Sequence, residues 1–203
     1  MSIEKRLAQG LRQLAVETDQ AKLAEYLNLL NKWNKAYNLT AIRRIEEMVD
    51  KHIIDSLSIA PYLHGQNILD VGTGAGLPGI PLAITFPGKN FVLLDSNGKK
   101  TRFLTEAKRQ LRLDNIEIVQ SRVENYHFEA GFDTVTSRAF ASLEQMIAWT
   151  EHLINARGIW LAMKGKKPQQ ELQMIQYTHQ TVDIQLPGSE DSRCIVIIKK
   201  TED

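Results

Sequence analysis

The sequence predicts an α/β fold in which a mostly parallel sheet is covered by helices on both faces. From residue 67 onward, short apolar runs alternate with stretches of helical periodicity, the pattern of successive strand–helix–strand units. A glycine-rich turn at 70–81 joins the first apolar run to a helical one. This order of strand, glycine turn and helix opens nucleotide-type sites at the carboxyl end of a parallel strand.

Length and composition set the bounds of this prediction. With 203 residues, 43% of them hydrophobic and 24% charged, the chain suits one globular unit with at most an appendage. No apolar run is long enough to span a membrane, and residues 1–14 are too charged for a signal peptide. A single cysteine, Cys194, excludes internal disulfides and is consistent with a reducing cytoplasm. The net charge of +1 means that any nucleic acid must be bound by a local basic face.

The N-terminal part is predicted to be helical. Apolar residues recur at helical spacing over 3–16, 19–37 and 46–60, and Pro61 is expected to end the third helix. Thr18 or Asp19 suits the N-cap of the second helix. Residues 1–60 are therefore expected to form a helical extension on a domain of residues 61–203.

Strands and helices are expected to alternate over the rest of the chain, in a seven-stranded sheet. The last two strands are separated by the turn-rich link 187–192, which suits a terminal antiparallel pair. The predicted strands lie near 67–71, 90–94, 115–120, 132–136, 158–163, 180–186 and 193–199. The predicted helices lie near 78–86, 97–112, 142–155 and 168–176.

The glycine turn predicts a close approach between backbone and ligand. Gly72, Gly74 and Gly76 are closely spaced, and each removes a Cβ that would collide with a bound molecule. Asp95 ends the next apolar run, about 20 residues after the turn, at the usual distance for an acid that binds a ribose diol.

The choice of nucleotide depends on the acid before the turn. Residues 74–79 also satisfy the dinucleotide pattern, so a nicotinamide-dependent oxidoreductase stays open, as does a plain turn with two surface acids. Asp70, however, is a like-charge neighbour for a pyrophosphate. S-adenosylmethionine carries a sulfonium and an ammonium instead of phosphates. A methyl-donor site is therefore favoured, with Asp70 on the methionine side and Asp95 on the ribose.

Seven motifs together give a more specific indication. They lie at 38–40, 52–56, 70–81, 94–96, 121–124, 137–140 and 164–165. With them the chain resembles the RsmG family, also called glucose-inhibited division protein B, over most of its length, whereas beyond Lys166 the match is loose. The resemblance implies a Rossmann-like class I S-adenosylmethionine-dependent methyltransferase fold. It also implies methyl transfer to N7 of a guanine in 16S ribosomal RNA, with the RNA or the small ribosomal subunit as partner.

The expected cofactor residues surround the strand ends. The resemblance assigns Arg138 to the cofactor and to the active site as the catalytic residue, and no general base is expected. The alternative for Arg138 is an ion pair with a nearby acid, and the alternative for Glu124 is an exposed surface acid. The expected cofactor-binding residues are Gly72, Thr73, Gly74, Gly76, Leu77, Asp95, Ser96, Val123, Glu124 and Arg138.

Four basic residues are candidates for RNA contact: Arg43, Arg44, His52 and Lys164. Lys164 is equally well explained as a solvated cation at a strand end. His52 and Asp55 lie one helical turn apart and either line a cleft or form a local hydrogen bond. This pair supplies too few ligands for a metal site, so no metal is expected.

The reaction type follows in part from what the motifs lack. Methylation of cytosine C5 needs a cysteine nucleophile, and Cys194 is far from the glycine turn in sequence. The residues 137–140 do not match the Asp/Asn-Pro-Pro-aromatic motif usual for exocyclic amines. Guanine N7 has an in-plane lone pair and needs no general base.

Two alternative functions stay open, a small-molecule methyltransferase and a catalytically silent RNA-binding module. A sealed apolar pocket above Arg138 favours the first of these, whereas a wide cationic cleft argues against it.

Overall fold

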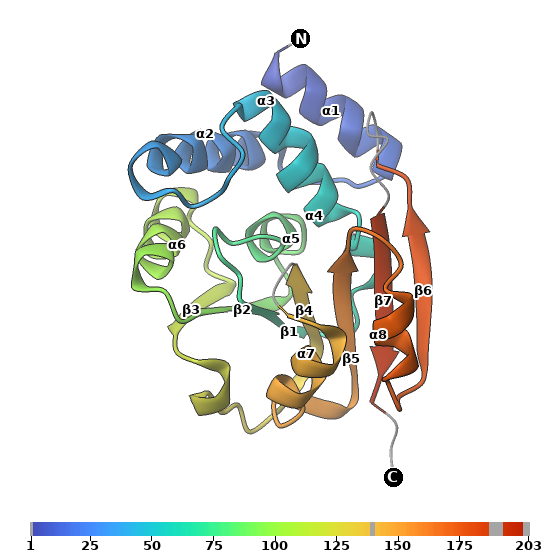
Figure 1. The fold of residues 1–203 in the computed structure, drawn as a ribbon. Helices are drawn as coiled ribbons and strands as arrows, with labels where there is room; N and C mark the ends of the chain where they lie inside the picture. Colours follow the sequence, from blue (N-terminus) through green and yellow to red (C-terminus); the bar gives the residue numbers. More distant parts are fainter. Residues whose placement is uncertain (1, 139–140, 187–192, 201–203) are drawn as a thin grey trace.

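The computed structural model describes residues 2–138, 141–186 and 193–200, and within them seven strands form one sheet (Figure 1). The strand order is β3-β2-β1-β4-β5-β7-β6. Neighbours among β1 to β5 are parallel, whereas β7 is antiparallel to both β5 and β6. The strands are β1 (Asn67–Val71), β2 (Asn90–Asp95), β3 (Ile116–Gln120), β4 (Phe132–Arg138), β5 (Ile154–Lys164), β6 (His179–Ile184) and β7 (Arg193–Lys199). The predicted fold class is confirmed, while the link 187–192 lies outside the described residues.

The chain reverses its direction of travel across the sheet between β1 and β4. Strands β1, β2 and β3 run outward on one side, and β4 and β5 run outward on the other. The connections leaving the carboxyl ends of β1 and β4 therefore diverge and leave a crevice at the edge of the sheet. This topology places the glycine turn, which follows β1, beside the end of β4.

The first two helices form as predicted. They are α1 (Ile3–Leu14) and α2 (Gln20–Tyr37). The Asp19 carboxylate accepts a hydrogen bond from the Lys22 backbone N–H at 3.0 Å and caps α2. Asn38 ends α2 in the left-handed conformation, which asparagine tolerates better than most residues.

The third helix has a widened central turn and ends earlier than predicted. It consists of α3 (Ile45–Met48), a π-helical turn (Val49–Ile54) and α4 (Asp55–Leu57). The Ser58 hydroxyl donates to the Asp55 carbonyl at 2.7 Å and satisfies one of the carbonyls at the helix end. Pro61 lies in a separate 3₁₀ turn (Ala60–Tyr62) and does not itself stop the helix. Such π-helical turns often occur at functional sites.

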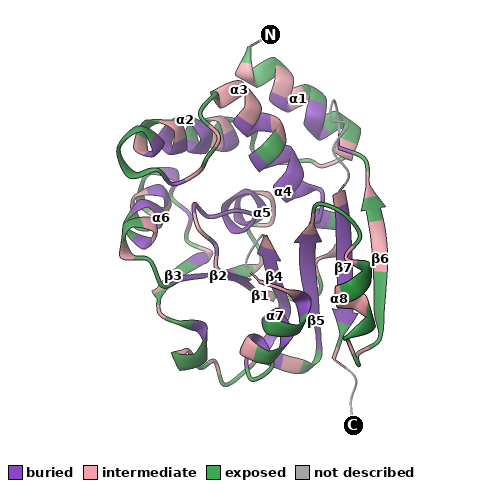
Figure 2. Cartoon of the chain, in the orientation of Figure 1, coloured by how far each residue is buried: buried purple, intermediate pink, exposed green. Residues whose placement is uncertain are grey.

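Helices cover both faces of the sheet, and the strands alternate accordingly. The remaining helices are α5 (Gly79–Thr85), α6 (Gly98–Leu111), α7 (Leu143–Thr150) and α8 (Gln169–Gln173). Phe91 and Leu93 of β2 pack with the N-terminal helices, α5 and α6, whereas Val92 and Leu94 pack on the α7 side. The central strands are consequently buried along most of their length (Figure 2). No helix in the described ranges is long and apolar enough to cross a membrane.

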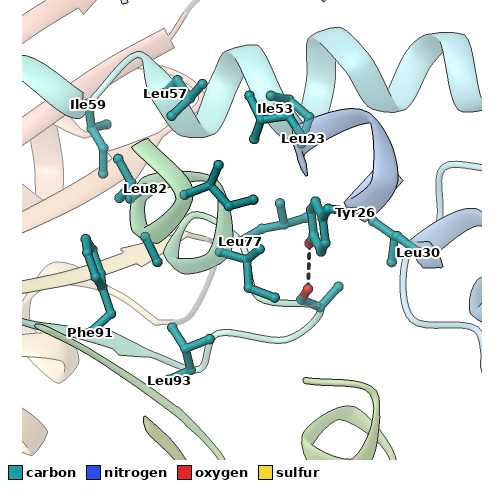
Figure 3. Close-up of a cluster of buried hydrophobic side chains, with 14 of the residues drawn as sticks. Leu23, Tyr26, Leu30, Ile53, Leu57, Ile59, Leu77, Leu82, Phe91 and Leu93 are labelled. Atoms are coloured by element: carbon teal, nitrogen blue, oxygen red, sulfur yellow. Dashed lines mark hydrogen bonds between the residues drawn. The ribbon is translucent and has the colours of Figure 1, made fainter. Parts of the chain in front are cut away.

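The N-terminal helices share one apolar core with the sheet and contact the glycine turn directly. Leu23 and Tyr26 of α2 belong to the same buried cluster as Leu77 and Leu82 (Figure 3). The fully buried Tyr26 hydroxyl donates to the Ala75 carbonyl at 2.6 Å. Because that carbonyl belongs to the turn, α2 helps to hold the turn in place.

Candidate active site

Two adjoining cavities lie at the carboxyl edge of the sheet. The larger has a volume of about 580 Å³ and the smaller of about 380 Å³. Gly72 and Lys100 line both cavities, so the two form one trough. The glycine turn and the end of β4 face the larger cavity, whereas the ends of β2 and β3 face the smaller one.

The glycines of the turn serve two different purposes. Gly72 and Gly74 have positive φ angles of 65° and 63°, which non-glycine residues rarely adopt, and both line the trough. Gly76 lines neither cavity. A Cβ at Gly76 would lie 2.5 Å from Ile80 Cδ1 and 2.9 Å from Leu104 Cδ2, so Gly76 is required for packing beneath the turn. Its predicted contact with the cofactor stays a prediction.

Asp70 is fully buried beneath the turn and lines neither cavity, and its place on the methionine side of the cofactor stays a prediction. Its carboxylate accepts hydrogen bonds from the Thr73 hydroxyl at 2.6 Å and the Gly79 backbone N–H at 2.8 Å. Burial raises the pKa of Asp70 to about 7, although these two hydrogen bonds act in the opposite direction. Asp70 therefore ties the two ends of the glycine turn together.

Asp95 anchors the other side of the turn. Its carboxylate accepts hydrogen bonds from the backbone N–H groups of Gly74 and Asn97, both at 2.9 Å, and forms an ion pair with Lys100 at 3.4 Å. Ser96, Val123 and Glu124 line the same cavity. The structure thus gathers the four residues predicted for the ribose and adenine around one pocket.

These residues fit S-adenosylmethionine. The open side of the turn forms a cradle, because a Cβ on Gly74 would meet no atom closer than 3.9 Å. The carboxylates of Asp95 and Glu124 offer acceptors for a ribose diol and an exocyclic amine. Gly72, Thr73, Gly74 and Leu77 line the adjoining cavity, where the methionine end is expected.

The Asp95→Asn variant is expected to bind S-adenosylmethionine roughly ten- to a hundredfold more weakly, because hydrogen bonds to a charged group contribute about 1.5–3 kcal/mol. Titration calorimetry measures this change. The matched control is Glu117→Gln, which neutralises an exposed acid on the neighbouring strand β3, outside both cavities. An Asp95→Asn protein with wild-type affinity would remove Asp95 from the site.

Arg138 lines the larger cavity, as a site residue should, and it also forms an ion pair with a nearby acid, which was the alternative explanation for this residue. Its guanidinium donates to the Lys51 carbonyl at 2.8 Å and to Asp55 Oδ2 at 3.1 Å. Asp55 is 4% exposed and accepts a second guanidinium, that of Arg193, at 3.0 Å. The ion pair therefore holds Arg138 at the cavity wall.

His52 is a buried, neutral member of the same wall. One ring nitrogen lies 2.9 Å from the Thr40 hydroxyl and the other lies 3.0 Å from the Lys51 carbonyl. Burial, together with the positive charge of Arg138, lowers the pKa of His52 to about 4. His52 is consequently a weak base at neutral pH.

The other candidates for RNA contact are divided by the structure. Lys164 lines the larger cavity, where it forms an ion pair with Glu171 at 2.9 Å. Arg43 and Arg44 line neither of the two cavities. Arg43 donates to the Asn38 side chain at 2.7 Å, and Arg44 is exposed near two glutamates. In the described part of the chain, no group of three or more histidine, cysteine, aspartate or glutamate side chains is arranged to hold a metal ion.

Three cationic wall residues were missed by sequence reasoning, Lys51, Lys100 and Arg193. Lys51 is adjacent to His52, so the motif at 52–56 marks its position. For Arg193 no local signal exists, because its place depends on the insertion of β7 beside β5.

The same insertion changes the argument about Cys194. This residue pairs with Lys164 in the β5–β7 register, so it lies near the cavity despite its distance in sequence. Its side chain nevertheless packs into the core on the α7 side and does not line the cavity. Burial raises the pKa of the Cys194 thiol, which opposes a role as nucleophile.

The sheet topology, the glycine turn after β1 and the acid at the end of β2 define a class I S-adenosylmethionine-dependent methyltransferase. Solved structures share this fold. A SAM-dependent O-methyltransferase from Thermotoga maritima superposes with a TM-score of 0.59 at 14% identity, covering 81% of this chain and 72% of that one. A SAM-dependent methyltransferase from Aquifex aeolicus gives a TM-score of 0.56 at 15% identity, covering 72% and 90%.

The sequence identifies the family. Residues 19–191 match the GidB family, described as rRNA small subunit methyltransferase G. The chain is 58% identical over 199 residues to "Ribosomal RNA small subunit methyltransferase G" of Legionella pneumophila, covering 98% of this chain and 96% of that protein. The chain therefore belongs to the GidB family, as the motifs predicted.

Proposed function

We propose that this protein transfers a methyl group from S-adenosylmethionine to N7 of a guanine in 16S ribosomal RNA, in the cytoplasm. Membership of the GidB family supports ribosomal RNA of the small subunit as the substrate. The structural observation that carries the proposal is the charge of the larger cavity. Among the residues that the structure describes, five cationic side chains line it against one carboxylate, that of Asp55. Its cationic members are Lys51, Lys100, Arg138, Lys164 and Arg193.

This cavity suits a polyanion better than a small apolar metabolite. Each nucleotide of an RNA brings one phosphate, and lysine and arginine supply most of the electrostatic attraction for it. A small-molecule acceptor would favour a sealed apolar pocket above Arg138. The described residues do not form such a pocket.

The proposed reaction needs alignment rather than proton transfer. When bound, S-adenosylmethionine would supply an electrophilic methyl group. The lone pair of guanine N7 forms the new C–N bond while the methyl–sulfur bond breaks, so that S-adenosylhomocysteine leaves as a neutral thioether and the positive charge passes to the guanine. No prior deprotonation is needed. The cavity wall is consistent with a reaction that needs no general base. The pKa of His52 is low, and the carboxylate of Asp55 is held by two guanidinium groups, so neither side chain is suited to accept a proton. The protein's share is to orient the base and exclude water.

The proposal is tested with purified protein, labelled S-adenosylmethionine and small-subunit RNA from a strain that lacks this methylation. After digestion to nucleosides, the label is expected in 7-methylguanosine. RNA that already carries the modification is the control and is expected to accept little label. Label in another nucleoside would contradict the N7 assignment, and no label in RNA would contradict the substrate.

The same assay, run in parallel with naked 16S RNA and with assembled 30S subunits, shows which of the two accepts the methyl group.

A further inference from the structure

Lys100 lies at the junction of the two cavities. It is the third residue of α6, and it lines both the larger and the smaller cavity. Its ammonium group lies 3.4 Å from Asp95 Oδ2, while 36% of its side chain is exposed. The first turn of α6 contains no acidic residue, so this cation lies at the positive end of the helix and is held there by Asp95.

The acceptor sites of Asp95 are nearly filled. The Asp95 side chain is 6% exposed, and a carboxylate offers about four lone-pair sites on its two oxygens. Three donors already use them: the Asn97 N–H on Oδ1, and the Gly74 N–H and the Lys100 ammonium on Oδ2. A ribose diol brings two hydroxyl donors, which is one more than the remaining capacity of the carboxylate.

Of the three donors, Lys100 is the one that can leave. The N–H groups of Gly74 and Asn97 belong to the main chain of the glycine turn and of the N-cap of α6, so they are fixed. Lys100 reaches Asp95 through a flexible stem, at 3.4 Å instead of the 2.9 Å of the other two donors. Hydroxyl groups that donate to Asp95 are therefore expected to displace the ammonium.

After displacement, the Lys100 ammonium lacks a carboxylate in the larger cavity. Among the described residues, the carboxylate that lines this cavity is that of Asp55, and two guanidinium groups already hold it. Glu124 of the smaller cavity is the acid expected to bind the exocyclic amine of the adenine. The positive end of α6 also favours an anion at this place. A phosphate of the acceptor RNA is such an anion.

We propose that Lys100 changes its partner during the reaction. It holds Asp95 while the cofactor site is empty, and it binds a backbone phosphate of the RNA once a ribose occupies Asp95. This inference rests on the proposed function, since it describes how the same site receives the RNA. The affinity for RNA is then higher when the cofactor site is filled, and by linkage the affinity for the cofactor is higher when RNA is bound.

The test measures the affinity for unmodified 16S RNA with and without saturating S-adenosylhomocysteine, between about 50 and 200 mM salt. This probe keeps the ribose but has neither the sulfonium charge nor a methyl group to transfer. It therefore separates the effect of Lys100 from the charge of the methyl donor and from turnover. In wild-type protein the probe is expected to raise the RNA affinity about fivefold or more. The slope of log K against log salt is expected to steepen by about 0.7–0.9, the value for one phosphate contact.

Lys100→Gln is expected to lose this response. Its slope stays close to that of the empty wild-type protein in both states, because the cation that changes partner is missing. Lys100→Arg keeps the charge and is expected to keep the steeper slope. The matched control is Lys99→Gln, since Lys99 is an exposed lysine of the same helical turn that lines neither cavity. Lys100→Met, which keeps an apolar stem, repeats the measurement if the glutamine variant does not fold.

Calorimetry with S-adenosylhomocysteine separates this role from a structural one. Lys100→Gln is expected to bind this probe at least as tightly as wild-type protein, because the competitor for Asp95 has been removed. A lower affinity would contradict the competition and overturn the inference.

A wild-type salt slope that is the same with and without the probe would also overturn the inference. The same holds for a Lys100→Gln protein that keeps the wild-type response, or that loses an equal part of the slope in both states. These results leave the proposed function intact. If wild-type protein binds RNA but places no label in 7-methylguanosine, the proposed function fails, and the response of Lys100→Gln still decides the role of Lys100. If wild-type protein does not bind RNA at all, both fail.

Discussion

Replacing Arg138 by lysine is expected to lower kcat/KM for methyl transfer about ten- to a hundredfold, a loss of roughly 1.4–2.8 kcal/mol in transition-state stabilisation. The guanidinium reaches the Lys51 carbonyl and Asp55 at the same time and lies 3.5 Å from the His52 ring. An ammonium group is a point charge on a flexible stem and does not reproduce this planar set of donors. The side chain is therefore expected to lose its fixed position at the cavity wall.

Stability is expected to change little in the same variant. Asp55 keeps its ion pair with Arg193, and lysine keeps the positive charge, so no carboxylate is left buried without a partner. The melting temperature is expected to fall by no more than about 4 °C, which corresponds to roughly 1 kcal/mol for a chain of this length. Arg157→Lys, at an exposed position of β5 outside both cavities, is the matched control. Full activity of Arg138→Lys at unchanged stability would remove Arg138 from the site.

The largest loss of stability is expected from Gly79→Ala. A Cβ at this position would lie 2.7 Å from Asp70 Oδ2 and would also overlap Leu93 Cδ2. Both neighbours are fully buried, so neither can move aside without disturbing the core. Overpacking of this kind costs about 1–3 kcal/mol, and a melting temperature roughly 3–10 °C lower is expected.

The same substitution is expected to weaken cofactor binding. Gly79 donates its backbone N–H to Asp70, the residue that ties the glycine turn together, so a displaced helix start moves the turn. Gly88→Ala is the matched control, because a Cβ there meets nothing within 4 Å and its φ is not positive. Thermal denaturation and calorimetry with S-adenosylmethionine measure both effects. Equal melting temperatures for the two variants would contradict the packing argument.

Two features of this protein were predictable from short stretches of sequence. Local hydrophobic periodicity predicted the order of strands and helices from residue 67 onward, and the structure follows that order. The bounds differ most after β4, where α7 ends at Thr150 instead of 155 and β5 begins at Ile154 instead of 158. The glycine turn and Asp95 were equally visible, because backbone torsion and the spacing to the next strand end are local properties. The early end of the third helix could not be predicted in this way, because it depends on hydrogen bonding around Ser58 rather than on Pro61.

The tertiary structure alone decided which side chains share the cavity wall. The burial of Asp70 was not visible in the sequence, because it results from the packing of α5 against the end of β1, where Thr73 and Gly79 bind its carboxylate. Asp55 is separated by 83 residues from Arg138 and by 138 from Arg193, and no local pattern links such positions. They meet because the sheet order inserts β7 next to β5, and the buried carboxylate of Asp55 is paired there with guanidinium groups from two distant strands.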